Sequence, residues 1–139
     1  MVNNPTVQLI AELGSGPREV GRARRALARV LHQWGVIGDS ADLAILMTSE
    51  LVTNAIRHGA APVLLKAGLA DRSLRVEVQD LLCDGVELHD PAPDDEDGRG
   101  LQIVDVLSDL WGWGPHERGK QVWFVVATAA GTGAASRPG

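Results

Sequence analysis

The chain has 139 residues, a formal net charge of −5 and 45% hydrophobic residues. That length fits one compact domain with a sizeable core, and the composition excludes wholesale disorder. The acidic balance argues against direct nucleic-acid binding, because such binding depends mainly on lysine and arginine neutralising phosphates. No apolar run reaches the roughly 18 residues of a membrane span, and the single cysteine, Cys83, offers neither an internal disulfide nor a metal cluster. We therefore expect a cytoplasmic protein that does not associate with membranes.

The first half of the chain predicts a strand followed by two helices. Residues 7–13 read as a short strand, and residues 17–34 have the periodicity of an amphipathic helix. Apolar side chains recur on one side of this helix and arginines on the other: Val20, Ala23, Leu27, Val30, Leu31 and Trp34 against Arg18, Arg22, Arg25 and Arg29. A second helix is expected to begin after an N-cap at Asp39 or Ser40, to run to His58 and to end at Gly59.

The second half predicts a hairpin, an irregular acidic segment, a third helix and a last strand. Residues 62–70 and 73–80 read as two strands, and the alternation of Val76 and Val78 with polar residues indicates a hairpin with one buried face. Regular structure is lost over residues 81–97, a third helical stripe covers 101–111, and residues 120–128 read as a buried strand. This order predicts an α+β sandwich, with helices on one face of a mixed, mainly antiparallel sheet.

Polar residues interrupt the apolar pattern of the second helix. Glu50, Asn54 and His58 are spaced four apart and fall on the side that carries Met47 and Leu51. A carboxylate and an amide in such surroundings cost several kcal/mol when they have no partner. Two interpretations stay open: Glu50 and Asn54 bond to each other or to nearby backbone, or a polar ligand completes them.

Two further positions interrupt the regular pattern. Asp80 ends a strand before the irregular segment, so its carboxylate either caps a turn or accepts a hydrogen bond from an exocyclic amine such as that of adenine. Gly98, Arg99 and Gly100 open the third helix, where glycines allow an anion to approach the helix N-terminus; the alternative is a flexible loop. The acidic run before them would repel phosphate unless it pairs with Mg²⁺ or Arg99.

Taken together and in this order, these segments resemble a known fold. SELVTNAIRHG (Ser49 to Gly59) resembles the N-box of the GHKL ATPase fold, VEVQD (Val76 to Asp80) its adenine-binding strand, and GRGLQIVDVLSDLWGW (Gly98 to Trp113) its glycine box. Gyrase B, histidine kinases and mismatch-repair ATPases share this two-layer Bergerat fold. The strongest resemblance is to the small anti-sigma-factor serine/threonine kinases, particularly the single-domain ATP-binding regulators of actinobacteria. It covers residues 7–128 as one domain, which leaves 1–6 and 129–139 as flexible tails.

The resemblance implies a role for each matching residue. Glu50 corresponds to the catalytic glutamate and Asn54 to the Mg²⁺ ligand, while His58 occupies the position of a histidine that often follows the N-box. Asp80 corresponds to the aspartate that accepts from the adenine amine. The glycine box adds a phosphate-binding group of residues: Gly98, Arg99, Gly100 and Leu101.

The chain departs from the family pattern after Asp80. The family usually has Asp-x-Gly at this place, whereas this chain reads Asp80-Leu81-Leu82, with Asp84-Gly85 as a displaced candidate. The end-of-strand position favours Asp80 as the adenine-binding residue. The missing glycine leaves open how closely the backbone approaches adenine, and so how tightly ATP binds.

The implied function is that of an ATP- and Mg²⁺-dependent serine/threonine kinase that phosphorylates an anti-sigma-factor antagonist and regulates a sigma factor. Whether the chain forms a homodimer stays open. Three alternatives remain: an ATP-binding regulator that sequesters a partner without catalysis, a detached ATP-binding half of a histidine kinase, and an interaction domain with no ligand. The arginine stripe of the first helix is either a docking face for an acidic partner or a solvated surface.

Overall fold

A computed structural model describes residues 6–81, 103–105, 107–116 and 119–128 of the chain. Its elements are β1 (Gln8–Leu13), α1 (Glu19–Gln33), α2 (Asp39–His58), β2 (Val63–Ala70), β3 (Ser73–Asp80), β4 (Leu110–His116) and β5 (Gly119–Ala127). Residues 103–105 and 107, just before β4, are helical. Among the described residues, no helix is long and apolar enough to cross a membrane.

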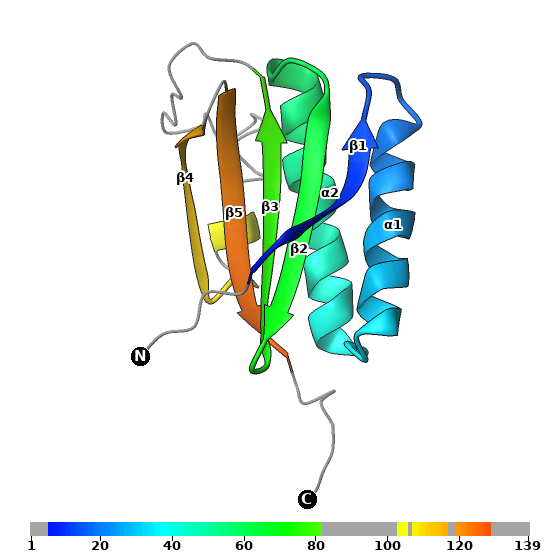
Figure 1. Ribbon diagram of the computed structural model, residues 1–139, viewed down its shortest axis with the longest axis vertical. Helices are drawn as coiled ribbons and strands as arrows, with labels where there is room; N and C mark the ends of the chain where they lie inside the picture. Colours follow the sequence, from blue (N-terminus) through cyan, green and yellow to red (C-terminus); the bar gives the residue numbers. More distant parts are fainter. Residues whose placement is uncertain (1–5, 82–102, 106, 117–118, 129–139) are drawn as a thin grey trace, which may run out of the picture.

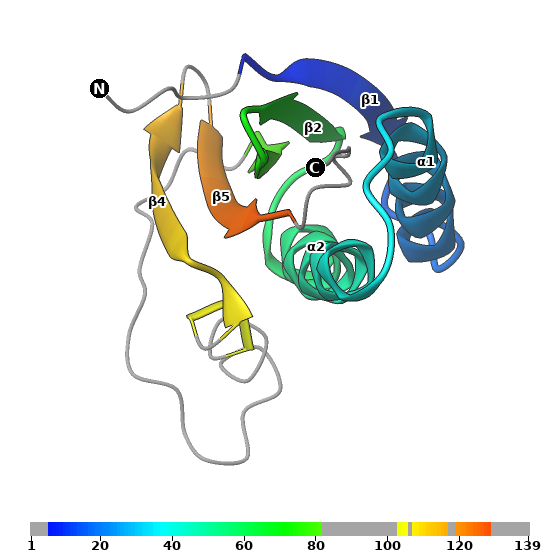
Figure 2. The same cartoon turned by 90° about the horizontal axis from the view of Figure 1, so that it is seen from below.

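The strands form one sheet with the order β1-β2-β3-β5-β4, in which every neighbouring pair is antiparallel. Helices α1 and α2 lie side by side against one face of this sheet (Figures 1 and 2). The predicted α+β sandwich with helices on one face is therefore confirmed, and none of the described strand pairs is parallel.

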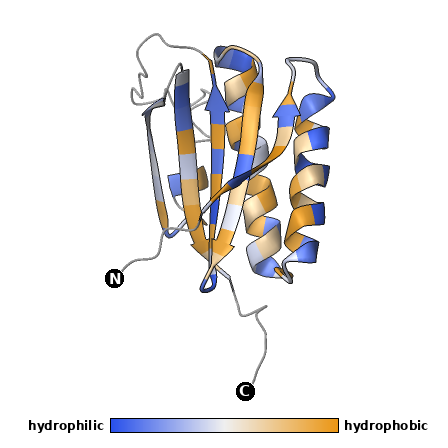
Figure 3. Ribbon diagram, in the orientation of Figure 1, coloured by the Kyte–Doolittle hydropathy of each residue, from blue (hydrophilic) through white to orange (hydrophobic). Residues whose placement is uncertain are grey.

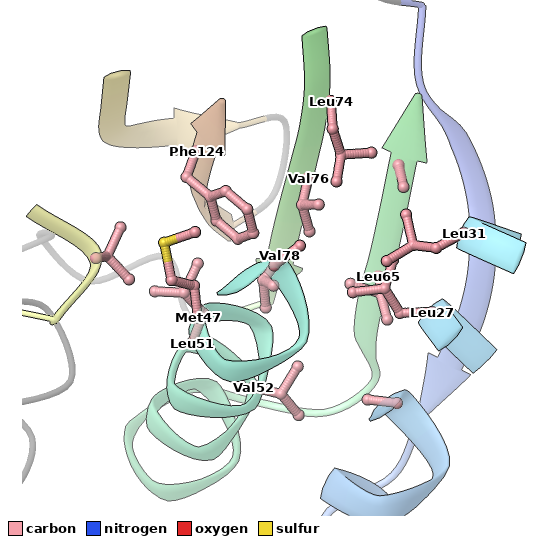
Figure 4. Packing of buried hydrophobic residues seen from close by; sticks show 14 of the residues in the cluster. Leu27, Leu31, Met47, Leu51, Val52, Leu65, Leu74, Val76, Val78 and Phe124 are labelled. Carbon is pink, nitrogen blue, oxygen red and sulfur yellow. The ribbon is translucent and has the colours of Figure 1, made fainter. Parts of the chain in front are cut away.

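The hydrophobic core lies between the helices and the sheet. Figure 4 shows Met47 and Leu51 of α2 pointing toward Phe124 of β5, while Val52 points to the other side of the helix. Helix α1 contributes Ala23, Leu27 and Leu31 to the same core. Its predicted arginine side is exposed, which accounts for the hydrophilic outer surface of α1 in Figure 3.

Glu19 connects the end of β1 to the start of α1. Its Oε1 accepts hydrogen bonds from the Gly14 backbone N–H at 2.6 Å and from Arg22 Nη1 at 2.7 Å. The Gly14 N–H, assisted by the Arg22 charge, holds the pKa of the Glu19 carboxyl below its usual value.

The expected extension of the third helix to Trp111 is wrong. Residues Leu110–His116 form strand β4, which pairs along β5 with Trp111 opposite Phe124 and Gly112 opposite Trp123. A Cβ at position 112 would lie 2.6 Å from the Trp123 ring, so glycine makes room for this indole.

The predicted N-cap of α2 is also wrong. The cap is Gly38, with a φ of 73° that favours glycine, and it makes no side-chain capping bond. Asp39 and Asp42 lie in the first turn instead, where negative charge interacts favourably with the helix N-terminus. Gly59 follows the last residue of α2, as predicted.

The β2–β3 hairpin matches its prediction closely, but its polar face is less exposed than expected. Glu77 and Gln79 are buried with 8% and 5% of their surface exposed. Arg75 Nε donates to Glu77 Oε2 at 2.7 Å, Gln79 Nε2 donates to Gln121 Oε1 at 3.1 Å, and the Arg75 guanidinium lies 4.3 Å from the Trp123 ring centroid. A network of polar groups thus covers the face of the sheet that lacks helices.

Candidate functional site

The polar row of α2, which consists of Glu50, Asn54 and His58, lies along one side of the helix. Glu50 and Asn54 are half-buried, and His58, the last helical residue, is exposed. Both Met47 and Leu51 on the neighbouring flank are buried and point toward Phe124 (Figure 4). The structure therefore places the three predicted residues together, at the border between the core and the surface.

Glu50 and Asn54 differ in their interactions. No hydrogen bond or ion pair joins the Glu50 carboxylate to any described residue, which excludes the alternative in which Glu50 bonds to Asn54. Asn54 and His58 both have interaction partners. Of the two interpretations left open by the sequence, direct bonding between Glu50 and Asn54 is therefore wrong, and Asn54 has another partner.

Asp80 lies at the end of β3 with its side chain 3% exposed. Val76 and Val78 of the same strand face the core, so the two-residue period of the strand places Asp80 on the helix side of the sheet. The end of α2 is next to it: a Cβ at Gly59 would lie 2.5 Å from both Cγ and Oδ2 of Asp80. Asp80 is therefore close to the C-terminal end of α2, where His58 is the last residue.

The Asp80 carboxylate forms an ion pair with Lys120 of β5. Lys120 Nζ lies 3.0 Å from Oδ2 and 3.3 Å from Oδ1, and the two residues are directly opposite in the β3–β5 register. Gly119 allows the backbones of β3 and β5 to lie close together here, since a Cβ at position 119 would overlap the Asp80 backbone carbonyl. Burial of the charged carboxylate is thus balanced by a cation from the neighbouring strand.

The backbone after Asp80 is tied to the end of α2. The Leu81 N–H donates to the Ala60 carbonyl at 2.9 Å, which joins the residue after β3 to the residues that follow the helix. The structure therefore holds Asp80 from two directions, through Leu81 on the helix side and through Lys120 on the sheet side.

The predicted phosphate-binding residues lie outside the described part of the chain: Gly98, Arg99, Gly100 and Leu101. The same is true of Leu82, Asp84 and Gly85, and of the acidic run that precedes the glycines. The expectations for these residues stay predictions.

Two observations test whether the described residues fit a nucleotide. A carboxylate accepts hydrogen bonds only, so buried Asp80 suits the exocyclic amine of adenine. Glu50 is a half-buried carboxylate with no partner among the described residues, as expected of a group that acts on a ligand. The described residues contain no cluster of three or more His, Cys, Asp or Glu that could hold a metal by themselves. Asn54 would be the residue of the α2 row to contribute an oxygen ligand to Mg²⁺, which prefers oxygen ligands.

Sequence reasoning missed Lys120 because its role depends on pairing across strands. The residue opens the last predicted strand, and nothing in the local pattern distinguishes it from an ordinary solvated lysine at a strand end. An antiparallel pairing of the last strand with residues 73–80 would have placed a lysine opposite Asp80.

Comparisons with known proteins identify the family of the chain. The family model described as histidine kinase-like ATPase domain matches residues 13–126. Among solved structures, the chain is similar to the histidine kinase domain from Erythrobacter litoralis EL346 blue-light activated histidine kinase, with 16% identity and a TM-score of 0.48. That likeness covers 88% of this chain and 68% of the other. No curated protein matched the chain. The assignment therefore depends on the family match.

Proposed function

Because the chain belongs to the histidine kinase-like ATPase domain family, we propose that it binds ATP and acts as an anti-sigma-factor-type serine/threonine kinase. ATP binding is expected of a domain of this family. The observation that supports the catalytic part is the Glu50 carboxylate, which is half-buried on α2 and has no partner among the described residues. A group in this state is available to orient a hydroxyl nucleophile.

The proposed arrangement places the nucleotide between α2 and the strand end at Asp80. Asp80 accepts from the adenine amine, Asn54 contributes an amide oxygen toward Mg²⁺, and His58 lies at the end of the same row. When bound, Mg²⁺ supplies charge neutralisation at the phosphates. The glycine-box residues Gly98 and Gly100 are proposed to contact phosphates on the basis of the family resemblance.

In the proposed chemistry, Glu50 orients the hydroxyl of a protein serine or threonine and accepts its proton as that oxygen bonds to the γ-phosphorus of ATP. The bond from the γ-phosphorus to the β–γ bridging oxygen breaks in the same transfer, and ADP leaves. General base catalysis of this kind contributes about 10²- to 10⁴-fold to a rate. Asn54 acts on binding instead, because its amide contributes to holding the magnesium–nucleotide complex. The two residues should therefore have separable effects.

A transfer assay with γ-labelled ATP and a candidate antagonist protein tests this proposal. Glu50→Gln keeps the side-chain shape and removes the base, so transfer should fall about 100-fold or more while ATP binding persists. Asn54→Ala should weaken binding of magnesium–ATP itself. Ser49→Ala is the matched control on the same helix, because the one bond of the Ser49 hydroxyl to a described residue goes back to the Ile45 carbonyl. Normal phosphorylation by both site variants would show that the assignment is wrong.

A specific feature favours the alternative of a non-catalytic ATP-binding regulator that sequesters its partner. Leu81 and Leu82 follow Asp80 where the family has Asp-x-Gly, and the Leu81 N–H is already bonded to Ala60. This departure from the family pattern next to the proposed adenine-binding residue is what favours the non-catalytic regulator. In the same assay, ATP binding and partner binding without any labelled product would support this alternative over the kinase.

The partners we propose are a sigma factor and its anti-sigma-factor antagonist. Exposed arginines at the start of α1 and along its outer side form a basic surface on a chain whose net charge is −5: the N-cap Arg18, and Arg22, Arg25 and Arg29 within the helix. Such a surface complements an acidic partner and would speed its association. Reversal of charge at Arg25 and Arg29 should weaken partner binding, whereas Arg72→Glu in the β2–β3 turn should not. Equal partner binding by the wild type, the Arg25/Arg29 variant and Arg72→Glu would show that the α1 arginines are not a docking face.

A further inference from the structure

The ion pair between Asp80 and Lys120 lies beside the proposed position of the purine base. Both side chains point to the helix side of the sheet, as do Val78 and Val122, the opposed pair two positions earlier in the β3–β5 register. The Asp80 side chain is 3% exposed and the Lys120 side chain is 18% exposed, so Lys120 is the more accessible side chain of the pair.

The pair presents two opposite hydrogen-bonding groups side by side. A carboxylate only accepts hydrogen bonds, and a lysine ammonium donates three and accepts none. Adenine offers an amine donor at position 6 and an acceptor at N1, whereas a 6-oxopurine offers an acceptor at position 6 and a donor at N1. With adenine, Asp80 can accept from the amine at position 6 while Lys120 donates to N1. With a 6-oxopurine, Lys120 can donate to the oxygen at position 6 while Asp80 accepts from the N1–H.

We propose that Asp80 and Lys120 read the purine together, and that Lys120 allows the site to bind GTP as well as ATP. This inference depends on the proposed function, in which Asp80 contacts the base. Lys120 is then a residue that determines nucleotide specificity, in addition to its role as counter-charge to Asp80.

The expected binding of GTP depends on whether the oxygen at position 6 of its base finds a hydrogen-bond donor in the site. A buried carboxylate alone would face this oxygen acceptor to acceptor, which leaves both groups without a hydrogen. Sites that bond a substrate donor reject an analogue without it by roughly 10⁴- to 10⁵-fold. The Lys120 ammonium provides a donor within 3.3 Å of both carboxylate oxygens, so the oxopurine finds a partner and this rejection is lost. We expect GTP to bind within about 100-fold of ATP, well short of that limit.

Calorimetry of the full chain with ATP, GTP and ITP, each with magnesium, tests the inference. The wild-type chain should bind all three nucleotides. Lys120→Met removes the donor and keeps an unbranched side chain that is one atom shorter, so the ratio of GTP to ATP dissociation constants should rise at least tenfold. Lys120→Arg keeps a donor and should keep the ratio low. Lys66→Met is the matched control, since Lys66 lies opposite Glu77 on the other face of the sheet.

The outcomes separate this inference from the proposed function. A wild-type chain that binds ATP and rejects GTP and ITP by more than about 1,000-fold, close to the rejection expected of a carboxylate alone, overturns the role of Lys120 and leaves ATP binding intact. An unchanged ratio in Lys120→Met also overturns it. A chain that binds none of the three nucleotides contradicts both proposals. If Lys120→Met does not fold, the ratio of GTP to ATP dissociation constants in the wild-type chain decides by itself, against the same limit of about 1,000-fold.

Discussion

The contact between Gly59 and Asp80 gives the sharpest prediction from this structure. A Cβ at position 59 would lie 2.5 Å from Cγ and Oδ2 of Asp80 and 2.6 Å from the Ala55 carbonyl oxygen. Ordinary non-bonded contacts are about 3.5–4.0 Å, so the Asp80 carboxylate must move by about 1 Å to admit a methyl group. The φ of Gly59 is −100°, which any residue adopts, so backbone strain adds nothing to the cost.

Gly59→Ala should therefore affect both stability and nucleotide binding. Forcing a methyl group into a packed site costs about 1–3 kcal/mol of unfolding free energy. A displacement of about 1 Å breaks a hydrogen bond, and one that involves a charged group contributes about 1.5–3 kcal/mol. ATP affinity should then fall by about 10- to 150-fold, at 1.4 kcal/mol per factor of ten. Urea denaturation and ATP calorimetry measure the two effects.

A control and a double variant make this test specific. Gly16→Ala makes the same change where a Cβ would meet nothing within 4 Å, so it should leave both quantities nearly unchanged. Combining Gly59→Ala with Asp80→Ala removes the group that the methyl displaces, so the combined loss of stability should be less than the sum of the two single losses. Strictly additive losses, or wild-type ATP affinity in Gly59→Ala, would refute the reasoning.

Two further predictions concern local structure away from the site. Glu19→Gln should lower stability at neutral pH, because the lowered pKa of Glu19 means that its ionised form favours the folded state. This difference from the wild type is fully present above the ordinary glutamate pKa of 4.5 and should vanish as the pH falls below the lowered value, so parallel denaturation curves at all pH values would contradict it. Arg72 has a φ of 68° in the β2–β3 turn, where a side chain is strained. Arg72→Gly should raise the melting temperature by a few degrees through a gain of about 1 kcal/mol, and a lower melting temperature would show that the arginine side chain outweighs this strain.

Much of the fold could be predicted from sequence because its signals are local. The amphipathic pattern of α1, the row Glu50-Asn54-His58 and the alternation around Val76 each depend only on residues near in the chain. Strand β4 could not be read in this way, because its glycines and proline weaken a strand signal and its pairing partner lies in β5.

The same distinction applies to the candidate site. The spacing of Glu50 and Asn54 predicts that they share a helix face, which the structure places at the border of the core. Whether each polar group has an interaction partner depends instead on residues that are distant in the chain. The sequence therefore did not show that Asn54 has a partner or that Lys120 forms an ion pair with Asp80. Local spacing positions side chains, whereas cross-strand register decides which of them are paired.

Calorimetric titration of ATP into the full chain, with and without magnesium, tests the central claim most directly. We expect binding that strengthens with magnesium and is greatly weakened in Asp80→Asn, because the neutral carboxamide of asparagine is a weaker acceptor for the adenine amine than a carboxylate. The absence of binding at millimolar ATP, or equal affinity in the wild type and Asp80→Asn, would contradict it.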